Sequence, residues 1–182
     1  MSFLEYNYDI CFRPLRIFTR VASDNPHNHF SEEVFLKRVY AIEEHCIGCR
    51  LCEVRCVTQH SKSKDVVKAH RKEIPTPSRV KVQEQGAISF AVQCRHCEEP
   101  ACVYSCLSGA MSRDPLTGIV THDNERCIGC WTCVMVCPTG AVIPDVKTRK
   151  VAAKCDLCIG LEIPVCVYNC PNRALVYQEA SP

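Results

Sequence analysis

The sequence of 182 residues predicts an α+β fold in which short β-hairpins separate four groups of cysteines, behind an aromatic-rich N-terminal arm. Three observations lead to this prediction. Sixteen of the 17 cysteines form a fourfold internal repeat, which organises most of the chain. Short alternating apolar segments, typical of paired strands, lie between the groups. The first 40 residues hold eight of the 13 aromatic side chains and only one cysteine.

The N-terminal arm is assigned to residues 1–38. Ser31 is a suitable N-cap for a short helix, because Glu32 and Glu33 then lie in its positively polarised first turn. Three interpretations of the arm stay open: it packs over its own domain, its aromatic side chains dock on a partner subunit, or it is disordered. Cys11 has no cysteine neighbour at ligand spacing and is interpreted as a free thiol.

The remaining cysteines fall into four groups, each of which ends in C-x3-C. Groups one and three read C-x2-C-x2-C-x3-C, whereas groups two and four lengthen the middle gap to four and seven residues. A proline follows the last cysteine in groups three and four (Pro138, Pro171), but Val57 and Leu107 stand there in groups one and two. The groups are, in order, Cys46, Cys49, Cys52 and Cys56; Cys94, Cys97, Cys102 and Cys106; Cys127, Cys130, Cys133 and Cys137; Cys155, Cys158, Cys166 and Cys170.

The segments between the groups are expected to form antiparallel strand pairs. Residues 79–92 contain two alternating runs around Gln85 and Gly86, which predicts a tight hairpin. The two prolines in residues 73–78 predict an irregular connection before it. The other predicted pairs are 39–42 with 174–177, 110–113 with 119–121, and 142–143 with 151–153.

Composition restricts the function and the compartment. With 22 Lys and Arg against 20 Asp and Glu, the net charge of +2 gives no general reason to expect nucleic acid or an anionic membrane as partner. No apolar run has the length of a bilayer span, and the first residues lack the pattern of a signal peptide. We therefore expect a cytoplasmic protein, in which thiols stay reduced and bind metal rather than form disulfides. Glycine-rich nucleotide-binding motifs are absent from the sequence.

The cysteine spacing indicates [4Fe–4S] clusters. In the bacterial two-cluster arrangement, C-x2-C-x2-C supplies three thiolates to one cluster, and the fourth cysteine ligates the neighbouring cluster. Spacing alone therefore favours clusters in close pairs. Structural zinc is the competing metal, but its sites use two C-x2-C knuckles separated by a longer loop. Attached haem requires C-x-x-C-H, which does not occur here.

Residues beside the cysteines are candidates for tuning the clusters. Apolar neighbours such as Ile47, Ile128 and Ile159 are expected to exclude water from the clusters. Trp131 is expected to shield a cluster rather than to relay electrons. Basic residues would stabilise added negative charge and raise a reduction potential, although each is equally interpretable as solvated surface; they are His45, Arg50, Arg95, His96 and Lys154.

Five stretches carry a resemblance to a known family. The sequence is similar to the four-cluster ferredoxin-like subunits of the dimethyl sulfoxide reductase and formate dehydrogenase type, from about residue 39 to residue 177. Within that family it most resembles the electron-transfer proteins associated with nickel carbon monoxide dehydrogenase. The stretches are CIGCRLCEVRC (46–56), QHSKSKD (59–65), QCRHCEEPACVYSC (93–106), CIGCWTCVMVCP (127–138) and AKCDLC (153–158).

The resemblance implies two pseudo-symmetric ferredoxin-like halves, each holding two [4Fe–4S] clusters. Residues 39–78 and 151–182 would form the half with groups one and four, and residues 79–150 the half with groups two and three. The family's crossed ligation, carried onto this sequence, gives four ligand sets: Cys46, Cys49, Cys52 and Cys170; Cys155, Cys158, Cys166 and Cys56; Cys94, Cys97, Cys102 and Cys137; Cys127, Cys130, Cys133 and Cys106.

The expected function is electron transfer without catalysis by the chain itself, since rigid clusters need placement and burial rather than acid–base residues. By resemblance, the partners would be a carbon monoxide dehydrogenase as donor and a hydrogenase or a pyridine-nucleotide-reducing flavoprotein as acceptor. A first alternative is the iron–sulfur subunit of a molybdenum or tungsten enzyme acting on formate or aldehydes. A second alternative, of another class, is a structural metal-binding scaffold.

Overall fold

The computed structural model describes residues 37–73, 77–145 and 150–179. The arm as far as residue 36, with Cys11 and the predicted helix from Ser31, lies outside the described residues, as does 74–76 of the proline-containing connection. Residues 37 and 38, which the sequence analysis assigned to the arm, instead open the first strand. No helix among the described residues combines the length and the apolar character that a membrane crossing requires.

The strands of the described residues form two-stranded antiparallel sheets, and each predicted pair is confirmed. In the hairpin around Gly86, Val80 and Val82 are buried while Lys81 between them is exposed, as the alternating pattern predicts. Gly86 has φ +62°, a conformation that glycine adopts without strain at the turn. The pairs are β1 (Lys37–Ala41) with β8 (Leu175–Glu179), β2 (Val80–Gln85) with β3 (Ile88–Gln93), β4 (Met111–Arg113) with β5 (Val120–His122), and β6 (Ile143–Asp145) with β7 (Lys150–Ala153).

Short helices, which the sequence analysis did not anticipate, carry the third cysteine of every group. Each begins one residue before that cysteine, so that the fourth cysteine follows about one turn later on the same side. Only the first of them extends well beyond this turn. The helices are α1 (Leu51–His60), α3 (Ala101–Tyr104), α4 (Thr132–Met135) and α5 (Val165–Tyr168).

Two further helical segments flank group one. A 3-10 turn, η2 (Glu43–His45), leads into the first cysteine. Helix α2 (Val66–Arg71) follows α1 and is N-capped by Asp65, whose carboxylate accepts a hydrogen bond from the Lys68 N–H at 2.8 Å. The cap stabilises the start of α2, and the buried Ala69 lies where α2 packs against α1.

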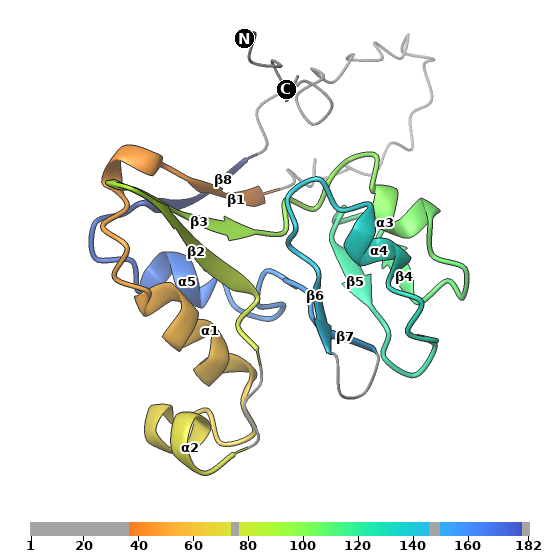
Figure 1. The fold of residues 1–182 in the computed structure, drawn as a ribbon, viewed down its shortest axis with the longest axis horizontal. Helices are drawn as coiled ribbons and strands as arrows, with labels where there is room; N and C mark the ends of the chain where they lie inside the picture. Colours follow the sequence, from red (N-terminus) through yellow and green to blue (C-terminus); the bar gives the residue numbers. More distant parts are fainter. Residues whose placement is uncertain (1–36, 74–76, 146–149, 180–182) are drawn as a thin grey trace, which may run out of the picture.

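Two hydrophobic cores organise the fold. Figure 1 shows β1, β8, β2 and β3 with α1 and α5 on one side of the molecule, and β4 to β7 with α3 and α4 on the other. The first core contains Val39, Leu175 and the buried residues of the β2–β3 hairpin, and the second contains Met111 and Val151. The hairpin at 80–93 therefore packs with groups one and four, whereas Val151 packs with groups two and three, unlike the division at residues 79 and 151 that the family resemblance implied.

Candidate metal centres

The loops that carry the first two cysteines of each group share a left-handed residue. It stands immediately before the second cysteine and is Gly48 (φ +65°), His96 (φ +47°), Gly129 (φ +73°) or Leu157 (φ +55°). A left-handed residue reverses the chain locally, which turns successive thiols toward a common centre. His96 and Leu157 adopt this conformation although it disfavours side chains with a Cβ, so surrounding contacts must hold these two loops.

Two hollows are each lined by four cysteines that come from two different groups. The first hollow contains Cys46, Cys49 and Cys52 of group one together with Cys170 of group four, and we name it site A. The second contains Cys127, Cys130 and Cys133 of group three together with Cys106 of group two, and we name it site D. One thiol in each hollow, Cys49 in site A and Cys130 in site D, belongs to an exposed residue.

The other grouped cysteines also lie together across groups, since Cys56 and Cys166 belong to the first core, Cys155 packs against it, and Cys102 and Cys137 pack against the second. Burial raises the pKa of Cys166, and the nearby thiols of Cys155, Cys56 and Cys158 raise it further. We name these four cysteines site B. Burial likewise raises the pKa of Cys102, with further increases from Cys94 and Cys137. With Cys97, which follows Cys94 in the same loop, these cysteines are named site C.

Electrostatic interactions between cysteines of different sites arrange the four sites in one order. Cys52 of site A acts on Cys166 of site B. Cys94 of site C acts on Cys155 of site B, whose pKa is raised to about 12 chiefly by burial. Cys102 of site C acts on Cys133 of site D, whose pKa burial raises to about 11. Neighbouring thiols therefore link the sites in the sequence A, B, C, D.

Backbone N–H groups donate to the sulfur of the fourth cysteine in three groups. The N–H of Arg79 lies 3.2 Å from the Cys56 Sγ, that of Met111 3.4 Å from the Cys106 Sγ, and that of Ala174 3.2 Å from the Cys170 Sγ. Such bonds stabilise the thiolate form, which is the form that binds metal. In its site, each of these three cysteines lies with three cysteines of another group.

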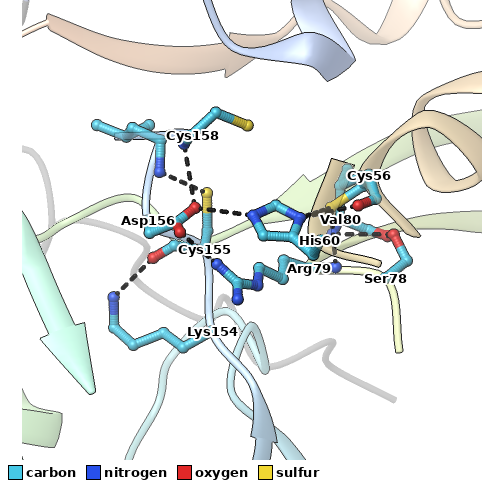
Figure 2. A network of polar contacts seen from close by, with 10 residues as sticks. Cys56, His60, Ser78, Arg79, Val80, Lys154, Cys155, Asp156 and Cys158 are labelled. Atoms are coloured by element: carbon cyan, nitrogen blue, oxygen red, sulfur yellow. Dashed lines mark hydrogen bonds and ion pairs between the residues drawn. The ribbon is translucent and has the colours of Figure 1, made fainter. Parts of the chain in front are cut away.

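A charged network ties the end of α1 to the group-four loop at site B, as Figure 2 shows. The Asp156 carboxylate forms an ion pair with Arg79 at 2.5 Å and accepts a hydrogen bond from the His60 Nε2 at 3.2 Å. It also accepts from the Cys158 N–H at 3.0 Å. The His60 Nδ1 lies 2.8 Å from the Cys56 carbonyl oxygen and 3.7 Å from the Cys56 Sγ.

The charges of this network support one another. Despite the opposing effect of burial, the hydrogen bonds to Asp156 and Cys56 raise the pKa of His60 to about 9, so its imidazole is positively charged at neutral pH. The pKa of Asp156 falls well below its usual range because its interactions with His60 and Arg79 outweigh burial. No local sequence pattern predicts this network, since His60 and Asp156 are 96 residues apart in the chain.

The basic residues predicted to tune the clusters differ in burial and in charge. Arg50 is exposed and pairs with Glu84 at 3.0 Å. His96 is completely buried, and its Nδ1 accepts the Val120 N–H at 2.9 Å. Burial, then the charges of Lys154 and Arg38, lower the pKa of His96 to about 3, so neither the predicted positive charge nor a solvated surface describes it.

The predicted apolar shield is only partly present. Ile47, Ile128 and Ile159 are 62%, 66% and 65% exposed, which contradicts their expected role in excluding water. Val103 and Val134 do pack against the second core beside its cysteines. Trp131 lines site D and donates from its indole Nε1 to the Lys150 carbonyl oxygen at 3.2 Å, which anchors its ring.

The cysteine sets have the chemistry that an iron–sulfur cluster requires. Four thiolates converging on one volume repel one another, and burial opposes their ionisation, as the pKa of about 12 for Cys52 indicates. A bound cationic core removes both penalties, because it neutralises the thiolates where they meet. Sites A and D are each lined by four cysteines, and no carboxylate is among their described lining residues. Thiolate ligands without carboxylates suit an iron–sulfur cluster.

Cysteines that converge in this way, on short helices and left-handed loops, define an iron–sulfur protein of the ferredoxin-like class. Residues 86–180, which contain cysteine groups two, three and four, match the family described as the 4Fe-4S dicluster domain. The chain belongs to this family.

Named relatives are iron–sulfur and electron-transport proteins. The chain is 40% identical over 152 residues to the electron transport protein HydN of Escherichia coli, covering 72% of this chain and 81% of that one. It is 36% identical over 152 residues to an iron-sulfur protein of Rhodospirillum rubrum, covering 75% and 79%. It is 34% identical over 139 residues to the B subunit of the anaerobic dimethyl sulfoxide reductase of Escherichia coli, covering 71% and 67%.

Proposed function

We propose that this chain is an electron-transfer subunit that holds four [4Fe–4S] clusters at sites A, B, C and D. The observation that carries the proposal is the convergence of cysteines from different groups, with Cys170 completing site A and Cys106 completing site D. Family membership and the electron-transport relatives support the same function. The sixteen cysteines of the repeat are the proposed iron ligands, in the crossed sets that the family resemblance implies.

The chain's own residues hold the sites in a row and keep them rigid. A [4Fe–4S] cluster, when bound, supplies a one-electron couple. Hydrogen bonds to the ligand sulfurs, and the Asp156 network at site B, fix the thiols in position. The exposed residues Cys49 and Cys130 make sites A and D the natural ends of the row, where partner proteins exchange electrons.

We further propose that the two cores correspond to two pseudo-symmetric ferredoxin-like halves. Helices α1 and α5 contact each other in one half, and α3 and α4 in the other. From the packing, residues 39–93 with 154–179 belong to the first half, and residues 94–153 to the second. Reduced cysteines in such number are typical of a cytoplasmic protein, and we propose that location.

The proposed partners are a carbon monoxide dehydrogenase as donor and a hydrogenase or a pyridine-nucleotide-reducing flavoprotein as acceptor. The resemblance of the cysteine stretches supports this route. The second candidate is the iron–sulfur subunit of a molybdenum or tungsten enzyme, which the similarity to the dimethyl sulfoxide reductase B subunit favours. Anaerobic purification of the native complex, followed by metal analysis, separates the two: nickel supports the first, and molybdenum or tungsten the second.

The clusters are tested on the full chain purified without air. The proposal predicts about sixteen iron and sixteen sulfide per chain, with EPR signals that appear on reduction. Cys130→Ser is expected to damage one cluster and to slow electron flow between partners, whereas Cys11→Ser, outside the repeat, leaves both unchanged. Stoichiometric zinc without sulfide would support the scaffold alternative instead, and unchanged electron flow in Cys130→Ser would contradict an obligatory row of clusters.

A further inference from the structure

Lys154 is a buried cation at the junction of the two inner sites. Its residue is only 5% exposed. The ammonium Nζ donates to the carbonyl oxygen of Val120 and, at 3.2 Å, to that of Cys155. In Figure 2 a dashed line joins the Lys154 ammonium to the Cys155 carbonyl oxygen. Carbonyl dipoles solvate the ammonium, but they do not neutralise its charge.

The described part of the chain offers no anion to neutralise this ammonium. No carboxylate there lies within ion-pair distance of the Lys154 Nζ. Asp156, two residues along the chain, is already paired with Arg79 and His60. His96 is neutral, and Arg38 acts on it with the same sign as Lys154. Because buried charges in proteins are normally paired, the compensating charge of Lys154 must come from elsewhere.

Lys154 contacts the loops that carry candidate ligands of two different sites. At site B it directly precedes Cys155, whose carbonyl oxygen accepts from the Lys154 Nζ at 3.2 Å. Towards site C its other acceptor is Val120, whose N–H donates to the His96 Nδ1 at 2.9 Å. His96 directly precedes Cys97 of site C.

We infer that Lys154 is the shared counter-ion of sites B and C, and that it makes the inner pair of clusters easier to reduce than the same pair without it. The inference rests on the proposed function, since the thiolate-ligated clusters supply the missing negative charge. One electron enters from the donor through an outer site and leaves to the acceptor through the other. The donor is oxidised and the acceptor is reduced.

The test compares variants of Lys154 that differ in charge, in side-chain length and in hydrogen bonding. Lys154→Met keeps the length without a donor, Lys154→Gln keeps a donor without charge, and Lys154→Arg keeps the charge. Lys81→Met, on an exposed strand position, is the matched control. Anaerobic redox titrations followed by EPR measure the midpoint potentials, and Cys155→Ser and Cys102→Ser assign the signals of sites B and C.

We expect Lys154→Met and Lys154→Gln to lower the reduced-to-oxidised ratio of both inner clusters about tenfold at a fixed potential. For a one-electron couple, this corresponds to a midpoint potential lower by about 59 mV. Lys154→Arg and Lys81→Met should keep wild-type potentials. Loading of iron that fails in the Met and Gln variants but survives in Lys154→Arg also supports a counter-ion.

Three results would overturn the inference while leaving the proposed function intact. They are wild-type potentials in a loaded Met or Gln variant, a shift confined to the outer clusters, and failure of Lys154→Arg to load iron. A wild-type chain without iron and sulfide would instead refute the proposed function itself. The two failures are therefore distinguishable in one set of samples.

Discussion

Replacing Asp156 with Asn is expected to destabilise the structure around site B by about 2–3 kcal/mol. The substitution keeps the shape and an oxygen that accepts the Cys158 N–H, but it removes the negative charge. Arg79 then remains an unpaired cation whose side chain is only 22% exposed, and His60, only 12% exposed, loses the carboxylate that favours its charged form. Removing one partner of a fully buried pair costs about 3–5 kcal/mol, and the partial exposure here reduces that figure.

The assay is urea unfolding of the loaded chain under anaerobic conditions, combined with the rate of iron release to a chelator. A loss of about 2–3 kcal/mol corresponds to roughly a 30- to 140-fold change in the unfolding equilibrium. Glu162→Gln, at an exposed position, is the control and should stay within about 0.5 kcal/mol of the wild type.

A double-mutant cycle with Arg79→Met isolates the ion pair from other effects of each substitution. We expect the double variant to lose less than the sum of the two single variants, because the second substitution removes a charge that the first left unpaired. Additive losses, or a loss below about 0.5 kcal/mol in Asp156→Asn, would refute the reasoning that this network holds the site B loop.

Two further predictions concern a glycine and a carboxylate away from that network. In Gly48→Ala, at a residue with φ +65°, the new Cβ would lie 3.3 Å from the Glu84 Oε1, whereas in Gly86→Ala, with φ +62°, the new Cβ would meet open space. We therefore expect Gly48→Ala to lower the free energy of unfolding by about 1 kcal/mol more than Gly86→Ala. Equal urea midpoints of the two variants would contradict this. The Ser63 hydroxyl and the N–H groups of Lys62 and Ser63 lower the pKa of Glu73, so its contribution is present above the ordinary value of 4.5 and disappears as pH falls through the lowered pKa. The difference in urea midpoint between wild type and Glu73→Gln should therefore shrink on acidification, and a constant difference would refute this.

The three hairpins could be predicted from the sequence because the signals for hairpins are local, whereas the pairing of β1 with β8 is predicted from the strand character of the two segments that flank the cysteine repeat. Turn residues such as Gly86 and alternating apolar positions act within a few residues of one another. The short helices at the cysteines escaped prediction, because four-residue segments such as Ala101–Tyr104 have little intrinsic stability. They are held by the packing of the loops around them, which no local pattern records.

The sixteen candidate ligands and their chemistry could be read from the sequence, because thiol spacing within a group is a local property that neither folding nor partners change. The neutral state of His96, the burial of Lys154 and the meeting of His60 with Asp156 became visible only in the folded chain. These properties depend on desolvation and on charges brought together from distant parts of the chain. A side chain's type is written in the sequence, but its electrostatic environment exists only once the chain has folded.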